Sequence, residues 1–167
     1  YTDLAERAVA ELQRTCRRLE LLRSLDPERD EFFVALGWAA EQPDAELGLR
    51  LGAALGNWFQ IRALGEGRQW LERMLGVPGG EEPSDARGSA LFWAANLANL
   101  QGESGVAAVY FEQAAAVFRA TENLPWLSSA LGLLGVQLSA VDRPRAQQLV
   151  DEGLALARTT GDRITIM

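Results

Sequence analysis

The side chains that most often carry out acid–base or metal chemistry are scarce in this sequence. Histidine, the commonest general base and nitrogen ligand for metals, is absent, and Cys16 is the only cysteine. Cys16 lies among arginine and leucine residues on an expected helix, so a packing role is a better interpretation than a reactive thiol. The sequence therefore predicts no catalytic residue, no metal ion and no cofactor, and it does not indicate an enzyme.

A loop over residues 76–84, GVPGGEEPS, is the clearest break in the chain. Its glycines could suggest phosphate binding, but the Gly-Lys-Ser or Gly-Lys-Thr of a phosphate loop is absent and two glutamates follow. Glu81, Glu82 and Asp85 could together bind a hard cation. A solvated acidic loop is the preferred interpretation of this cluster.

Net charge, cysteine content and the longest uncharged run limit the kinds of molecule and compartment expected for this chain. The net charge of -7 at pH 7 argues against direct binding of nucleic acid, because such a surface repels phosphate backbones. A single cysteine suits the reducing cytoplasm, and no signal peptide is recognised. The longest uncharged run, residues 123–141, carries a proline and several polar residues. We therefore expect a buried helix there instead of a helix that spans a membrane. The absence of an initiator methionine suggests a piece of a longer protein.

Helical periodicity runs through the sequence, and no segment has the pattern of a strand. Asp3 and Glu6 fit a capping box at the start of a first helix, which extends to about residue 25 or breaks near residue 15. Asp26, Asp44 and Pro144 mark further helix starts. We predict an all-α fold of about eight helices. After a second helix that ends near residue 43, the later ones are expected at about 44–64, 66–75, 85–101, 103–121, 124–141 and 144–160, with a break at Leu64-Gly65.

One hairpin design recurs at a spacing of 39 to 40 residues. Small residues in the two helices of a hairpin let their backbones approach, and a large apolar residue fills the groove to the next hairpin. The small position of the first helix is Gly56, Ala95 or Gly135 in the three hairpins. In the second helix, the first position is Gly67, Ala107 or Ala146, and the large apolar position four residues later is Leu71, Phe111 or Val150. The last position of the second helix is Met74, Ala114 or Gly153. Each hairpin leaves an apolar face open, so the hairpins are expected to stack.

These residues resemble the tetratricopeptide repeat (TPR), which has a small residue, a turn glycine (Gly102 here) and then Ala, Phe and Ala on the second helix. Met74 departs from this pattern, which has a small residue there. The resemblance covers residues 44–161 and implies a right-handed α-α superhelix of antiparallel hairpins. The chain is thus interpreted as a single TPR-like domain, 1–167, with an N-terminal hairpin at 1–43, repeats at 44–83, 84–123 and 124–161, and the start of a truncated helix at 162–167.

A narrower resemblance is carried by residues 30–39, DEFFVALGWA, and 67–73, GRQWLER. Both stretches are similar to the region after the ATPase module in large bacterial transcriptional regulators of the LuxR and SARP types. The resemblance implies a sensor or partner-binding segment that acts in signal transduction. Because the chain has no phosphate loop and no recognisable helix-turn-helix, neither ATPase activity nor DNA reading is expected of it.

In proteins that resemble this stack, the first helix of each hairpin lines a concave binding face. The residues expected on it are Asn57, Gln60, Phe92, Asn96, Asn99 and Ser139, together with Ala53, Gly132 and Val136. Amide side chains both donate and accept hydrogen bonds, which suits an extended peptide or a polar small molecule, although these amides could instead be solvated or cap the backbone. Arg50 and Arg62 are the expected cations if the ligand is acidic.

Two functions remain open from the sequence. One is a non-catalytic scaffold in the cytoplasm that binds a protein, a peptide or a small effector, as a segment of a bacterial transcriptional regulator. The other is a structural domain that self-associates, for example as a homodimer, through the end faces of the stack. The five tryptophans are expected mainly in the core, with Trp126 the one most expected to be partly exposed.

Overall fold

The computed structural model describes residues 1–12 and 18–160, and every regular element in these ranges is a helix. The all-α prediction is therefore confirmed. The chain divides into two compact units, residues 1–82 and 83–167. The division falls inside the predicted loop 76–84, one residue before the predicted junction of two repeats, and the handedness of a stack that includes both units stays a prediction. Cys16, the possible break near residue 15 and the expected helix start at 162–167 lie outside the described residues.

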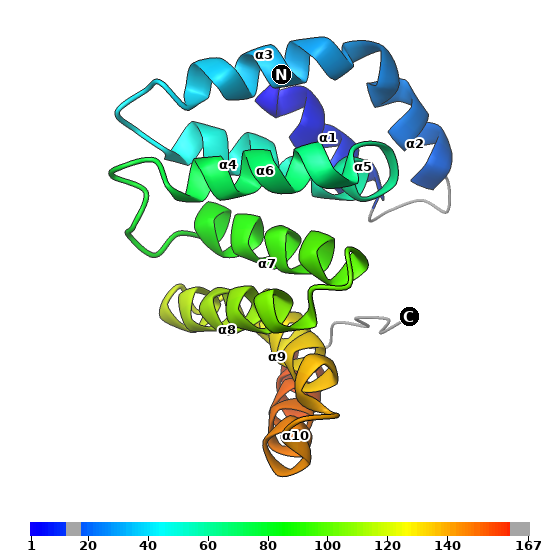
Figure 1. Ribbon diagram of the computed structural model, residues 1–167, viewed down its shortest axis with the longest axis vertical. Coiled ribbons are helices and arrows are strands. Elements are labelled where there is room, and N and C mark those ends of the chain that lie inside the picture. The colour runs from blue at the N-terminus through cyan, green and yellow to red at the C-terminus, as the bar shows by residue number, and fades with distance from the viewer. Residues whose placement is uncertain (13–17, 161–167) are drawn as a thin grey trace. The chain divides into compact units, whose positions relative to one another are not determined.

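Unit 1 is built from short helices (Figure 1). They enclose an aromatic and aliphatic core. Helix α4 packs against α1, α3, α5 and α6, and α1 also packs against α2. The core contains Phe32, Leu36, Leu49, Trp58, Phe59, Leu71 and Met74. The elements are α1 (Thr2–Leu12), α2 (Arg18–Leu25), η1 (Asp26–Glu28), α3 (Arg29–Ala39), α4 (Glu46–Ala54), α5 (Gly56–Arg62) and α6 (Leu64–Leu75).

The long helix predicted over residues 44–64 is interrupted in the structure. Leu55, next to Gly56, forms a turn that separates α4 from α5. The predicted break at Leu64-Gly65 is wrong by one or two residues, because Ala63 leaves the helical region with φ -148° and ψ 51° and α6 begins directly after it. Helices α5 and α6 then approach closely, since a Cβ on Gly67 would lie 2.3 Å from the ring of Phe59.

Met74, which departs from the repeat pattern, is fully buried. Its side chain occupies space that Gly48 leaves open on α4, because a Cβ on Gly48 would lie 2.5 Å from the sulfur of Met74. A large residue on α6 is thus matched by the smallest residue on α4. The packing here differs from the predicted one, in which a small residue would stand on the second helix.

The polar residues at the helix starts partly follow the prediction. Helix α1 begins at Thr2, so Asp3 lies inside its first turn and the predicted capping box is wrong. Asp44 accepts a hydrogen bond from the backbone N–H of Glu46 at 2.9 Å and so supports the start of α4. At the start of α10, Asp142 accepts from a backbone N–H three residues later, at 3.1 Å.

Unit 2 consists of two helical hairpins (Figure 1). Helix α8 packs against α7 and α9, and α9 packs against α10. Gly102 forms the first turn with φ +82°, as predicted for Gln101-Gly102-Glu103, and the N–H of Glu103 donates to the carbonyl of Ala98 at 3.0 Å. The elements are α7 (Asp85–Leu100), α8 (Ser104–Ala120), α9 (Leu124–Leu138) and α10 (Arg143–Thr160). No helix in residues 1–12 and 18–160 is long and apolar enough to cross a membrane.

The predicted register is visible in the packing of unit 2. A Cβ on Gly135 would lie 2.9 Å from the carbonyl oxygen of Ala146, so α9 and α10 are in close backbone contact. Ser128, a buried polar residue, donates to the carbonyl of Gly153 at 2.8 Å and ties the other end of the same pair. The predicted repeat positions buried in unit 2 are Ala95, Ala107, Phe111, Ala114, Gly135, Ala146 and Gly153.

Candidate functional site

The six residues predicted to bind a ligand fall in both units. Asn57 and Gln60 lie half-buried on α5 in unit 1. Phe92, Asn96 and Asn99 lie on α7, and Ser139 follows α9, in unit 2. Two of the six predicted residues therefore belong to unit 1 and four belong to unit 2.

Phe92 is a core residue of unit 2. Its ring is in edge-to-face contact with Phe111 on α8, at a centroid distance of 5.6 Å, and with Trp126 on α9, at 4.9 Å. Only 8% of the residue is exposed. Phe92 thus joins three helices and leaves little of its ring for a ligand.

The tryptophans follow the prediction in part. Trp58 is buried, and Trp126 is partly exposed while its ring stacks on Phe118 at 5.8 Å. Trp38, however, is 55% exposed on α3, where it lies with Tyr1 and Val34 on the open side of the helix. Helical spacing alone did not distinguish Trp38 from the core tryptophans.

The amides of α7 are engaged by neighbours in two different ways. The Nδ2 of Asn96 donates to the carbonyl of Phe92 at 2.9 Å, so this side chain is bonded to the backbone of its own helix. The Oδ1 of Asn99 accepts from the Nε2 of Gln137 at 3.0 Å, which joins α7 to α9. Both members of this second pair keep a further polar atom for a ligand. Asn99 and Gln137 therefore form a polar bridge across the first helices of the two hairpins.

A hollow of about 360 Å³ lies between α9 and α10, and Ser139 lines it. Gly135, Ala146 and Val150 form its apolar part. Its other lining residues are Val136, which is 58% exposed, and the polar residues Ser139, Arg143 and Gln147. Gln137 adjoins Val136 in the chain, so the polar bridge and the hollow both involve helix α9.

Arg143 is the cation of this surface, and the sequence interpretation missed it. No carboxylate in the described part of the chain pairs with Arg143. Arg50 and Arg62, the cations that were predicted, each pair with a carboxylate of the chain itself. A hollow that forms only where two helices cross gives no signal in the spacing of residues along one helix.

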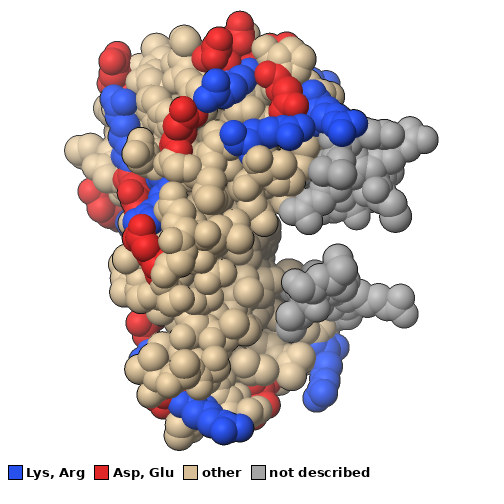
Figure 2. All heavy atoms as spheres, turned by 45° about the vertical axis from the view of Figure 1, so that its right-hand side comes forward, with Lys and Arg blue, Asp and Glu red and all other residues tan. Residues whose placement is uncertain are grey.

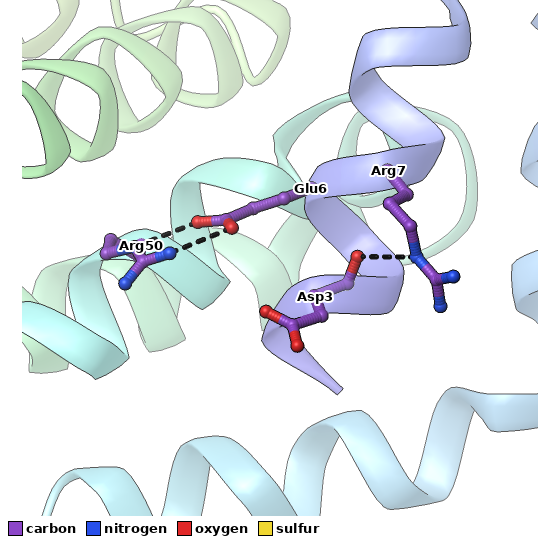
Figure 3. A network of polar contacts seen from close by, with 4 residues as sticks. All are labelled: Asp3, Glu6, Arg7 and Arg50. Atoms are coloured by element: carbon purple, nitrogen blue, oxygen red, sulfur yellow. Dashed lines mark hydrogen bonds and ion pairs between the residues drawn. The ribbon is translucent and has the colours of Figure 1, made fainter.

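The Arg50 pair illustrates how unit 1 uses its arginines (Figure 3). Both carboxylate oxygens of Glu6 on α1 accept from Arg50 on α4, each at 2.9 Å. The hydrogen bonds to Glu6 and its negative charge raise the pKa of Arg50 above its usual value. Glu6 therefore links two helices instead of capping its own, and Arg50 is not available to an acidic ligand.

Asp26 forms a second link in unit 1, between η1 and α5. Its carboxylate accepts hydrogen bonds from Trp58 Nε1 at 2.9 Å and from Arg62 Nε at 3.0 Å, and its other oxygen forms an ion pair with a second nitrogen of Arg62 at 3.0 Å. Burial would raise the pKa of Asp26, but the hydrogen bonds from Trp58 and Arg62 and the arginine charges outweigh it and lower the pKa below 3.8. The ionised carboxylate therefore stabilises unit 1 above that pH, and the contribution is lost as the pH falls through the lowered pKa.

The acidic side chains do not gather into one patch on the face drawn in Figure 2. On the face drawn in Figure 2, acidic and basic side chains lie interleaved, and every basic residue of the sequence is an arginine. In the loop cluster, Glu81 accepts from the N–H of Gly79 at 2.9 Å, and Asp85 accepts from the hydroxyl of Thr121 at 2.7 Å. Across residues 1–12 and 18–160, no three acidic, histidine or cysteine side chains are grouped as a metal site would require.

Comparison with known proteins gives a likeness in fold. No family model and no curated protein matches the chain. The crystal structure of BtubC (BKLC) from P. vanneervenii is similar, with a TM-score of 0.65 and 20% sequence identity over 99% of this chain and 75% of that chain. At this level of identity the likeness concerns the fold and assigns neither ligand nor partner.

Proposed function

We propose that the chain is a non-catalytic scaffold whose α7/α9 surface binds an extended peptide segment of a partner protein. The observation that carries the proposal is that one helix, α9, contributes both to the Asn99–Gln137 bridge and to the hollow. The bridge offers amide groups to a peptide backbone, and the hollow offers apolar space for one side chain. Arg143 at the rim favours a segment that carries a carboxylate close to that side chain.

We further propose that this scaffold is the sensor or partner-binding segment of a bacterial transcriptional regulator in the cytoplasm. The support is the resemblance carried by residues 30–39 and 67–73. The sequence of the whole gene tests the proposal. A phosphate-loop module before this segment or a helix-turn-helix after it is expected, and a gene that encodes neither would contradict the assignment.

Peptide binding is tested by NMR titration of the isotope-labelled protein. The probes are N-acetylated pentapeptides with a free carboxylate at the C-terminus and Leu, Asp or Arg as the residue before it. The Leu peptide is expected to shift the amide signals of Asn99, Gln137 and Ser139 more than the Arg peptide does. Binding that is confined to other residues would contradict the proposed surface.

Arg143→Gln is expected to weaken binding of the Leu peptide by about tenfold, since a charge-assisted hydrogen bond is lost. Arg145→Gln is the matched control, because it removes the same charge from the same helix but Arg145 pairs with Glu112 on α8. An equal effect of both variants would mean that the peptide responds to net charge and not to this surface.

A further inference from the structure

Two ion pairs link helices α8 and α10. Arg145 pairs with Glu112, and Arg119 pairs with Glu152 at 2.7 Å. The partners follow the same order along the two helices. On each helix the acid and the base are seven residues apart, about two turns, so they lie on the same side. Helix α10 thus places a base opposite the acid of α8 and an acid opposite its base.

Helix α10 repeats the α8 charge pattern on another of its sides. The repeat shift of 39 residues between the second helices places Asp151 at the position of Glu112. The same shift places Arg158 at the position of Arg119, and both residues of α10 are exposed. Asp151 accepts from Gln147 of the same helix at 3.0 Å, while Arg158 has no carboxylate partner within the ranges that the structure describes. Asp151 and Arg158 thus have the same seven-residue spacing as Glu112 and Arg119, the two charges through which α8 pairs with α10.

Next to these charges, two apolar positions that are covered on α8 are open on α10. Phe111 and Ala115 on α8 are buried, and Ala115 is only 3% exposed. Their counterparts 39 residues later are Val150, which is partly exposed, and Leu154, which is 39% exposed. In the part of the chain that the structure describes, this side of α10 is therefore an open apolar strip, formed by Val150 and Leu154, with an acid and a base two turns apart along it.

We propose that a second copy of this chain covers the strip, through antiparallel packing of the two α10 helices about a two-fold axis. In an antiparallel copy, the partner charges met along α10 are first the base and then, seven residues later, the acid. Helix α10 presents its own charges to α8 in this same order, with Arg145 before Glu152. Asp151 of each copy then faces Arg158 of the other, and the two Leu154 side chains meet near the axis. Because a two-fold contact is self-complementary, one pair of charges yields two ion pairs across the interface.

The contact is one helix wide and depends on exposed charges. It therefore belongs with the small, transient interfaces and is expected to weaken as salt screens the ion pairs. Val150 and Gln147 line the hollow and also adjoin the strip. Arg143, however, lies eleven residues, about 16 Å, from Leu154 along the helix, so peptide binding and self-association are tested by different substitutions. Either one can fail without the other.

The test is sedimentation velocity of the intact chain over a wide range of protein concentration at low salt. The wild-type protein is expected to dimerise reversibly. Asp151→Arg and Arg158→Asp each set like charges against one another and are expected to weaken the dimer by about tenfold or more. Asp30→Arg, on α3, changes the net charge as Asp151→Arg does and is expected to leave the dimer intact.

The decisive sample is an equimolar mixture of Asp151→Arg and Arg158→Asp. One variant then carries two bases on the strip and the other two acids, so the mixture is expected to dimerise where each variant alone does not. Circular dichroism of each variant checks that it is folded, and Leu154→Asp gives a second route to dissociation through two carboxylates at the axis. A protein that stays monomeric at all concentrations, or a dimer that ignores both charge reversals, would overturn the proposal and leave the strip to another partner.

Discussion

The two hairpins of unit 2 share one register but are held together in different ways. In α7–α8, large rings fill the groove, and Phe92 and Phe111 are in edge-to-face contact at 5.6 Å. In α9–α10, Val150 stands where Phe111 stands in the first hairpin, and the backbones themselves come together at Gly135 and Ala146. The same repeat pattern therefore allows two ways of packing a hairpin. Large side chains fill the space between the helices in one, and the two backbones approach closely in the other.

The largest effect that separates the two hairpins is expected from trimming the shared large position. Phe111→Ala should lower the free energy of unfolding by about 3–5 kcal/mol, since it empties a fully buried site. Val150→Ala, the matched substitution in the second hairpin, should cost about 1 kcal/mol, because its two methyl groups are only partly buried. Urea denaturation followed by circular dichroism measures both. Equal costs would show that the hairpins are packed alike.

The next effect concerns close approach in α9–α10. Gly135→Ala should lower the free energy of unfolding by about 1–2 kcal/mol, because the strain of a Cβ against the carbonyl of Ala146 exceeds the gain in helix propensity. Gly132→Ala is the control on the same helix, since nothing lies within 4 Å of its added Cβ. It should instead stabilise the protein by about 0.5–1 kcal/mol. The same denaturation experiment would refute the close contact if both variants were stabilised.

The smallest effect compares the turns that follow α7 and α8. Gly102 has φ +82°, and Glu122, at the matching position after α8, has φ 56°, which costs a residue with a Cβ. Glu122→Gly should raise the free energy of unfolding by about 0.5–1 kcal/mol, and Gly102→Ala should lower it by about as much. Thermal melts measure both shifts. Gly105→Ala, three residues further on and inside α8, should stabilise; the turn explanation fails if it destabilises as Gly102→Ala does.

Features that depend on local chemistry were predictable from the sequence. The turn at Gly102 follows from the need for a residue that adopts positive φ at low cost, and the register follows from small and large residues at fixed spacing. Both are properties of a short stretch read by itself or against a copy of itself. They placed the helices of unit 2 to within a few residues.

Features that depend on tertiary partners were not predictable. Asp26 was read as a cap, but its carboxylate accepts from Trp58 and Arg62, which lie 32 and 36 residues away. Met74 was read as a departure from the pattern, and the space that it needs is left by Gly48 on another helix. In each case the deciding residue stands in a different element, at a separation that no repeat sets.

The paired charges between α8 and α10 also restrict how unit 2 can be deformed. A slide of α10 along α8 by two turns, about 10 Å, would set Glu112 against Glu152 in one direction and Arg119 against Arg145 in the other. Sliding is therefore opposed by repulsion as well as by the loss of two attractions, whereas a small rotation that opens the angle between the helices keeps each charge near its partner. The two ion pairs therefore resist sliding along the helix axis more than they resist a change in the angle between the helices. A pulling force parallel to the helices should meet the stiffer response.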